Sequence, residues 1–138
     1  MIFENGNVRD GFMHHFNTEE NICNIKAVGN ISISESLEAL NKVMNHPEFH
    51  ENLKFNVDLT EIRFNPSYNE IESIKARLIK QKERLKNKIA LVSVGSVSII
   101  VYLIAQYAKH NGLIIKSFTS FEKANDWINE TDESVTLQ

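Results

Sequence analysis

Two short strand-like segments in the first part of the chain predict a hairpin. Strand-forming side chains are concentrated in residues 11–16 (GFMHHF) and 21–29 (NICNIKAVG), and the polar stretch NTEEN connects them. Two such segments joined by a short polar connection are typical of a β-hairpin. We therefore expect an antiparallel hairpin within residues 11–33.

A helix should follow this hairpin, because apolar residues recur at intervals of three and four within residues 31–46. Ser34 is the expected N-cap of this helix. Pro47 should end it, because proline cannot continue the helical hydrogen bonds. The face expected to meet a sheet carries Leu37, Leu40, Val43 and Met44.

The middle of the chain repeats this strand and helix pattern. Residues 53–59 (LKFNVDL) alternate apolar and polar side chains, which predicts a strand, and residues 60–66 (TEIRFNP) are expected to form a loop. Ser67 and Glu70 then match the serine-x-x-glutamate capping box that starts a helix. The apolar stripe of this helix is Ile71, Ile74, Leu78 and Leu85.

The last third of the chain predicts two more strands and two more helices. Residues 89–94 (IALVSV) form an almost continuous apolar run, which is typical of a strand covered on both faces. A helix from Ser96 or Ser98 through Ala108 should stop at Gly112, and LIIKSF is the final strand. The closing helix, residues 120–129, should turn these side chains inward: Phe121, Ala124, Trp127 and Ile128.

The helix that begins near Ser96 is apolar on nearly all sides (VSIIVYLIAQYAKH). Such a helix needs cover beyond one face of a sheet. In order of preference, this pattern predicts a thick core, a homodimer interface, or the wall of an apolar cavity of about 300 Å³ or more. The last of these would be lined by Tyr102, Ile104 and their neighbours.

Together these elements predict an α/β fold with a mixed, mostly parallel β-sheet, an antiparallel N-terminal edge hairpin and about four helices. Residues 1–138 should form one domain, with its core in residues 11–129 and a frayed tail at 130–138.

Composition limits the classes of function. The 138 residues are 42% hydrophobic and 24% charged, which is ordinary for a globular domain, and the net charge of −3 disfavours sequence-independent nucleic-acid binding. A lone cysteine, Cys23, cannot form an internal disulfide and fits a reducing, cytoplasmic setting. The start MIFENGNVRD does not resemble a secretory signal, and Gln106 and Lys109 interrupt the longest apolar stretch, so we expect no integral membrane segment.

Several positions resemble the STAS or SpoIIAA-like domain family, especially its small stand-alone members. The matching features are a glycine before the first helix, an Asp-Leu pair ending a strand, and a phenylalanine that ends the last strand before an Ala-x-x-Trp helix. They correspond to Gly29, Asp58, Leu59, Phe118, Ala124 and Trp127, within residues 11–129. The resemblance implies a bacterial, regulatory module that binds another protein.

The same resemblance directs attention to Ser67. Anti-anti-sigma members carry Asp-Ser-Ser-Gly in the loop after the Asp-Leu strand, and its serine is phosphorylated. The corresponding residues run from Asn65 to Tyr68 (NPSY), and only Ser67 matches. An N-cap role explains Ser67 without phosphorylation, although a phosphate at a helix N-terminus is electrostatically favourable. Related proteins have also been compared with the CRAL-TRIO lipid-binding fold, which implies an apolar-ligand alternative.

Other polar residues at strand ends are candidates for a ligand or partner loop. Asp58 lies near the carboxyl end of a strand, where parallel sheets bind ligands, but a structural hydrogen bond is the simpler role. Thr60, Glu61 and Asn65 belong to the same edge. Ser96 and Tyr102 mark the start and face of the apolar helix.

Metal binding is not expected. His46 and His50 have helical metal-ligand spacing, but Pro47 lies between them, and the adjacent His14 and His15 would point to opposite faces of a strand. Cys23 is expected to be a small core residue. We therefore predict no metal and no cofactor.

Residues 75–88 (KARLIKQKERLKNK) are basic, whereas the segment FEKANDWINETDE is acidic. This contrast fits either a partner-docking surface or ordinary solvated helix faces. Neither a groove-reading element nor a set of stacking aromatics accompanies the lysines, so we expect no nucleic-acid partner.

The sequence thus favours a non-enzymatic STAS-like protein-binding or regulatory module, whose partner is another protein or a second copy of the chain. The contact surface would include the loops after the strands and the helix near Ser96. The alternative is a small apolar-ligand or lipid-binding protein with a pocket near Asp58 and Tyr102. An enzyme ranks third, because no base, nucleophile and oxyanion donor can be assembled from these positions.

Overall fold

The computed structural model describes residues 11–130 of the chain, so most of the expected tail lies outside the described residues. Five strands form one sheet in the order β1-β2-β3-β4-β5. In chain order, the elements are β1 (Gly11–Asn17), β2 (Ile22–Asn30), α1 (Ile33–Met44), β3 (Lys54–Arg63), α2 (Tyr68–Lys80), β4 (Ile89–Val92), α3 (Val97–His110), β5 (Ile115–Phe118) and α4 (Phe121–Ile128).

The strand pairing confirms the predicted mixed sheet. β1 and β2 are antiparallel, with Gly11 opposite Val28 and Asn17 opposite Ile22. The pairs β2–β3, β3–β4 and β4–β5 are parallel, and a helix connects the two strands of each pair. Since the strand order is sequential and parallel crossovers are right-handed, three successive crossovers place their helices on one face of the sheet.

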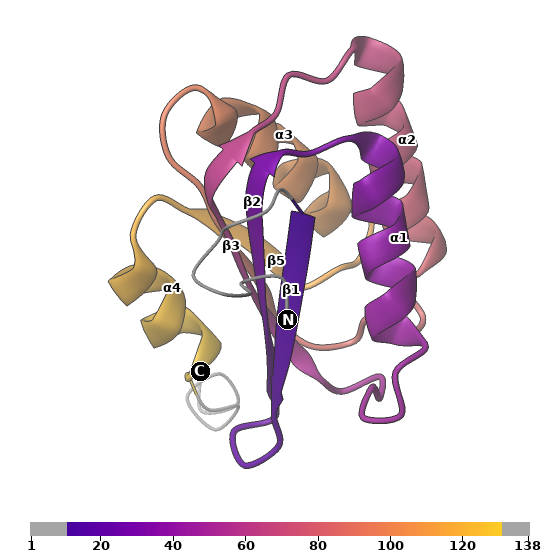
Figure 1. Ribbon diagram of the computed structural model, residues 1–138. Coiled ribbons are helices and arrows are strands. Elements are labelled where there is room, and N and C mark those ends of the chain that lie inside the picture. Colours follow the sequence, from indigo (N-terminus) through magenta and orange to yellow (C-terminus); the bar gives the residue numbers. More distant parts are fainter. Residues whose placement is uncertain (1–10, 131–138) are drawn as a thin grey trace, which may run out of the picture.

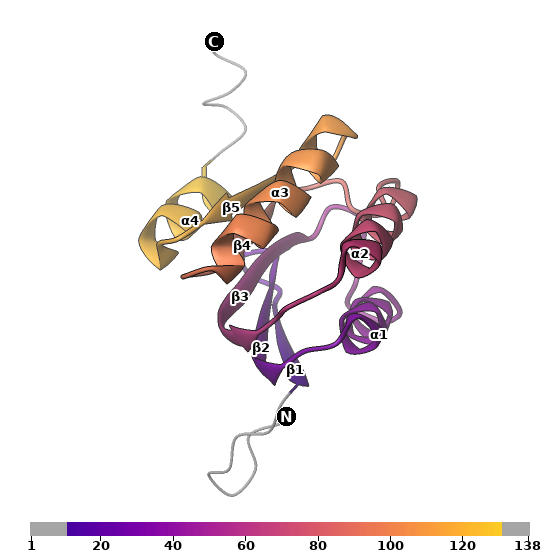
Figure 2. The same cartoon turned by 90° about the horizontal axis from the view of Figure 1, so that it is seen from above.

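Figures 1 and 2 show α1, α2 and α3 on this face and α4 alone on the other. Side chains alternate between the two layers along each strand. Phe55, Ile89 and Ile115 belong to the core beneath the three helices. Ala90 and Val92 instead pack with the α4 residues Ala124 and Ile128.

The first helix begins two residues earlier than expected, so Ser34 is not its N-cap. Ser32 caps it instead, because Ser32 and Glu35 form a reciprocal capping box: each backbone N–H donates to the other side chain at 3.1 Å. The sequence at Ser32 also fits the serine-x-x-glutamate pattern. As expected, the helix ends before Pro47.

Two other boundaries differ from the prediction. β3 continues to Arg63, because pairing with β2 resumes after an irregularity between Lys26 and Val28, so Thr60 and Glu61 lie in a strand and not in a loop. Helix α2 ends at Lys80, so Leu85 is buried beyond the helix, not on its stripe.

The closing helix also needs one correction. Ala124 and Ile128 are buried and Trp127 is partly buried, as expected, but Phe121 is 50% exposed. Phe121 is the first residue of α4, directly after the N-cap Ser120, and the buried side chains come from later turns.

Helix α3 is buried on one face only. Val101, Ile104, Ala105 and Ala108 are buried, whereas Ile99, Tyr102, Leu103 and Tyr107 are 41–65% exposed. We call these four residues the exposed α3 face. α3 lies above the edge strand β5 with α2 on only one side, where Lys75 lies over the Tyr107 ring, and the four side chains remain largely exposed to solvent. The prediction of a thick core around α3 is therefore wrong for half of the helix.

Across residues 11–130, no helix is both long enough and apolar enough to cross a bilayer.

Candidate functional site

A hollow of about 630 Å³ lies between the sheet and the helices α1 and α2. We call it the sheet–helix cavity. All five strands contribute to its lining from the sheet side, and the two helices cover it. The apolar lining includes Ile25, Leu40, Val43, Phe55, Val57, Ile74, Leu78, Leu85, Ile89, Leu91 and Ile115.

The packing of α2 explains this cavity. A crossover helix usually packs directly on its sheet, but α2 makes its main backbone contacts with α1 and α3. None of the thirteen residues of α2, all of them described, is fully buried. Beneath it, Ile25, Val57 and Leu91 on interior strands are only partly buried. The two aliphatic layers therefore face each other across an incompletely filled space.

Polar groups lie along the boundary of the sheet–helix cavity. Lys42 of α1 and Arg77 of α2 supply positive charge, and Glu35 and Glu38 supply negative charge. His14 of β1 also lines the cavity. Burial, followed by the nearby charges of His46 and Lys42, lowers the pKa of His14, which favours its neutral imidazole. Lys42 and Arg77 are thus the cationic side chains that line the cavity.

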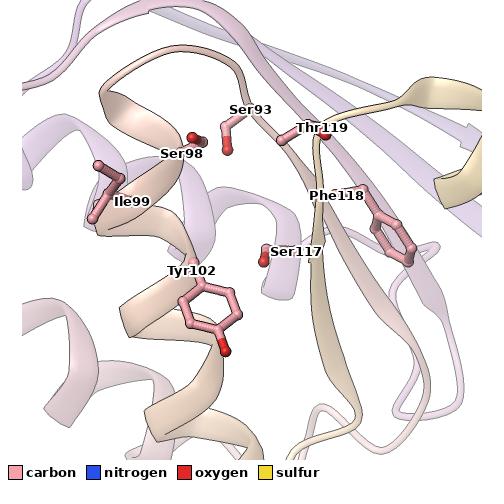
Figure 3. A pocket seen from close by; sticks show the side chains of 7 residues that line it. All are labelled: Ser93, Ser98, Ile99, Tyr102, Ser117, Phe118 and Thr119. Atoms are coloured by element: carbon pink, nitrogen blue, oxygen red, sulfur yellow. The ribbon is translucent and has the colours of Figure 1, made fainter.

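A second, smaller cavity of about 390 Å³ lies between the start of α3 and the carboxyl ends of β4 and β5 (Figure 3). We call it the serine cavity. It is lined by Ser93, Ser98, Ile99, Tyr102, Ser117, Phe118 and Thr119. The two cavities share no lining residue among those described.

Ser67 occupies the N-cap of α2. Its backbone N–H donates to Glu70 Oε1 at 2.8 Å, and the Glu70 N–H donates to Ser67 Oγ at 3.2 Å. The predicted capping box is therefore present, and it engages the Ser67 hydroxyl within the helix start.

Replacing Ser67 with alanine should lower the free energy of unfolding by about 1 kcal/mol, because an N–H at the start of α2 loses its acceptor. Urea unfolding followed by circular dichroism measures this loss. Ser32→Ala, which removes the matching cap of α1, should cost a similar amount, and Ser67→Asp should retain most of the stability. An unchanged midpoint in Ser67→Ala would show that the cap contributes nothing.

Asp58 serves the backbone of its own strand. Its Oδ1 accepts hydrogen bonds from the Thr60 N–H at 2.9 Å and the Thr60 hydroxyl at 2.7 Å. These contacts lie at the pairing irregularity of β3, where a backbone N–H leaves the regular ladder. Beside them, Glu61 forms a 2.7 Å ion pair with Lys26, whose pKa is raised by this hydrogen bond.

The remaining predicted site residues do not converge with Asp58. Asn65 is exposed between β3 and α2. Ser96 is the N-cap of α3, but its side chain makes no capping hydrogen bond. Tyr102 lines the serine cavity, but Ile104, which was expected beside it, is buried in the core. Asp58 lines neither cavity.

The contacts of His14, His46 and Cys23 are packing contacts within the fold. His46 stacks on Phe16 with ring centres 4.4 Å apart and meets His14 edge-on at 5.7 Å. In residues 11–130, no group of three or more His, Cys, Asp or Glu side chains could hold a metal ion. Cys23 is a fully buried core residue, as expected, and burial raises the pKa of its thiol to about 12.

The basic segment at residues 75–88 makes several contacts within the chain. Lys75 pairs with Glu72 at 2.7 Å and lies over the Tyr107 ring, which ties α2 to α3. Arg84 donates to the Met44 carbonyl at 2.9 Å, and Lys88 donates to the Trp127 carbonyl at 2.9 Å. These bonds join the segment to α1 and α4.

The sequence did not identify the residues that line the sheet–helix cavity as a site. Ile74 and Leu78 belong to the predicted apolar stripe of α2, and such a stripe looks the same whether it packs on a sheet or covers a hollow. Ser93 and Ser117 were also missed, because both lie inside strand-like runs. A hydroxyl within the apolar run IALVSV was the available signal for Ser93.

A search of solved structures finds a similar fold in a protein from Shewanella loihica PV-4, an uncharacterized member of the DUF3478 family with a SpoIIAA-like fold. The TM-score is 0.58 at 16% sequence identity, and the match covers 88% of this chain and 97% of that one. No protein-family model matches the sequence, and no curated protein matches it. The chain therefore has the SpoIIAA-like fold implied by its sequence resemblance.

Proposed function

We propose that the protein binds an elongated apolar molecule, such as a fatty-acyl chain, in the sheet–helix cavity. The observation that carries this proposal is a hollow of about 630 Å³ with a mainly aliphatic lining. Ligand sites commonly occupy about 300–1,000 Å³ and bury most of the ligand in such a lining. The sequence offered this function as its alternative, a small apolar-ligand or lipid-binding protein. The pocket proposed here lies under α1 and α2, whereas the sequence placed it near Asp58 and Tyr102.

The boundary of the cavity suits a ligand with an anionic head. An acyl chain would gain about 0.8 kcal/mol for each methylene that leaves water. Its carboxylate would be attracted to Arg77 or Lys42, both of which line the cavity. Ser36 of α1 also lines the cavity, and its hydroxyl donates to the Ser32 carbonyl at 3.0 Å and not to a base. It is therefore not an activated nucleophile, and we propose binding without catalysis.

Titration with cis-parinaric acid tests this function, because its fluorescence increases when the polyene chain leaves water. We expect saturable binding of one molecule per chain and displacement by dodecanoic acid. Dodecanol should displace the probe less well, because it lacks the carboxylate. A fluorescence signal that rises linearly without saturation would contradict a defined site.

A second candidate function is self-association through the exposed α3 face. Four large apolar side chains that are 41–65% exposed on one helix favour a protein contact. A second copy of the chain is the proposed partner, because a two-fold axis brings the same patch of both copies together.

Light scattering should accordingly give the mass of a dimer at high protein concentration. Leu103→Lys should restore the monomer, because it places a charge in the centre of the exposed α3 face. The matched control is Tyr68→Lys on α2, since Tyr68 is also exposed but lies outside this face. A monomeric mass at all concentrations, or equal effects of both variants, would contradict self-association by this route.

A further inference from the structure

The serine cavity is rich in hydroxyl groups from several elements. Ser93 follows β4, Ser117 and Thr119 lie at the end of β5, and Ser98 lies in the first turn of α3. In residues 11–130, no charged side chain lines this cavity. Its apolar wall includes Ile99 and Tyr102 of α3, which are 65% and 51% exposed. The cavity therefore combines neutral hydrogen-bond donors with an accessible apolar surface.

Ser93 is the unusual member of this set. The residue is only 1% exposed, and its backbone N–H donates to the Phe118 carbonyl at 3.0 Å. Its hydroxyl, however, has no hydrogen-bond partner among the described residues. Figure 3 shows this hydroxyl directed into the space between α3 and β5. A buried hydroxyl without a partner is unfavourable, so it indicates a group that a ligand satisfies.

The start of α3 gives this cavity a positive potential, because the first N–H groups of a helix carry partial positive charge. Two of the N–H groups here have acceptors within the same turn: those of Ser98 and Ile99 donate to the Gly95 and Ser96 carbonyls at 3.1 and 3.3 Å. The Ser96 side chain does not cap them. The Ser98 hydroxyl donates to the Gly95 carbonyl at 2.6 Å. A side chain built at Gly95 would meet no atom within 4 Å, so the space beside this turn is open.

We propose that the serine cavity binds the phosphate group of a small phosphate ester, whose planar or apolar part packs on Ile99 and Tyr102. Phosphate oxygens accept hydrogen bonds, and this cavity offers the Ser93 hydroxyl beside the positive end of the fourteen-residue helix α3, whose first-turn residue Ser98 lines it. Because the donors are neutral, the organic part contributes much of the affinity. This site shares no described lining residue with the sheet–helix cavity. Ile99 and Tyr102 also belong to the exposed α3 face, so a ligand here competes with self-association through that face.

The test is an NMR titration of the ¹⁵N-labelled protein with inorganic phosphate, phenyl phosphate and phenol. Both phosphates should shift the amide signals of Gly95, Ser96, Val97 and Ser98, and phenol should leave them in place. Phenyl phosphate should bind roughly tenfold more tightly than inorganic phosphate, because its ring is buried against the α3 wall. Equal affinity of the two phosphates would mean that free phosphate is the ligand, which overturns the ester proposal.

The variant Ser93→Ala distinguishes a role of this hydroxyl in ligand binding from a role in the stability of the fold. This variant should weaken phenyl phosphate binding roughly tenfold or more, because a hydrogen bond to a charged group is lost. Its urea midpoint should stay the same or rise, because an unpartnered buried hydroxyl is removed. The control Ser36→Ala, which lies outside the serine cavity, should bind normally. A lower midpoint with unchanged binding, or no amide shift with either phosphate, would overturn the proposal.

Discussion

Replacing Ile74 with tryptophan is expected to weaken fatty-acid binding by roughly 15- to 60-fold. Ile74 lines the sheet–helix cavity from α2, and the larger indole would occupy part of the space proposed for the acyl chain. Excluding two or three methylenes at about 0.8 kcal/mol each costs about 1.6–2.4 kcal/mol, which corresponds to this range. Competition against cis-parinaric acid measures the change.

The matched control is Ile71→Trp. Ile71 lies one turn earlier on α2 and is also partly buried, but it does not line the sheet–helix cavity. Its substitution should change the affinity less than about threefold, which is close to the usual context error of such estimates. Both variants should keep the wild-type circular dichroism spectrum. If Ile74→Trp binds as tightly as the wild type while Ile71→Trp does not, the ligand lies elsewhere.

Cys23 is expected to react with Ellman's reagent about a thousandfold more slowly in the native protein than in urea at pH 8. Burial raises the pKa of this thiol from its ordinary value of 9.0 to about 12. A shift of about three units reduces the reactive thiolate population about a thousandfold at this pH, before any steric protection. Time-resolved absorbance of the released thiolate measures both rates.

The same pKa shift makes the free energy of unfolding depend on pH through Cys23. The unfolded chain releases the thiol proton near 9.0, whereas the folded chain keeps it until about pH 12. The stability from the neutral thiol is therefore complete below pH 9 and is lost between about pH 9 and 12, at about 1.4 kcal/mol per pH unit. Cys23→Ala should lack this slope. Rapid stoichiometric labelling of the native protein at pH 8 would contradict the buried position.

The fold could be predicted because each element has a local signal that tertiary packing does not override. The alternation in LKFNVDL marks β3, the pair of Ser67 and Glu70 marks the start of α2, and Gly112, with φ of 108°, marks the end of α3. The predicted ends of elements were wrong where strand pairing or a competing N-cap residue sets the actual end. β3 extends because β2 continues beside it, and Ser32 displaces Ser34 because only Ser32 has a glutamate three residues later.

The candidate sites could not be predicted in the same way, because they depend on distances between elements. The apolar stripe of α2 does not reveal that α2 packs on its neighbouring helices and leaves space above Val57 and Leu91. Likewise, the apolar sequence of α3 does not reveal that β5 is the last strand, which leaves Ile99 and Leu103 exposed. Strand order and helix placement are properties of the whole chain.

The central claim is that an acyl chain lies between the sheet and α2, and adjacent residues of β4 offer a direct test. Leu91 faces the sheet–helix cavity, whereas Val92 packs under α4 on the opposite face. Isotope-filtered NOE spectra of the ¹³C-labelled protein with unlabelled dodecanoic acid show only those protein protons that lie close to protons of the acid. We predict NOEs from the acyl chain to the methyl groups of Leu91, Val57 and Ile74 and none to Val92. NOEs confined to Ile99 and Leu103 on the exposed α3 face would contradict the account.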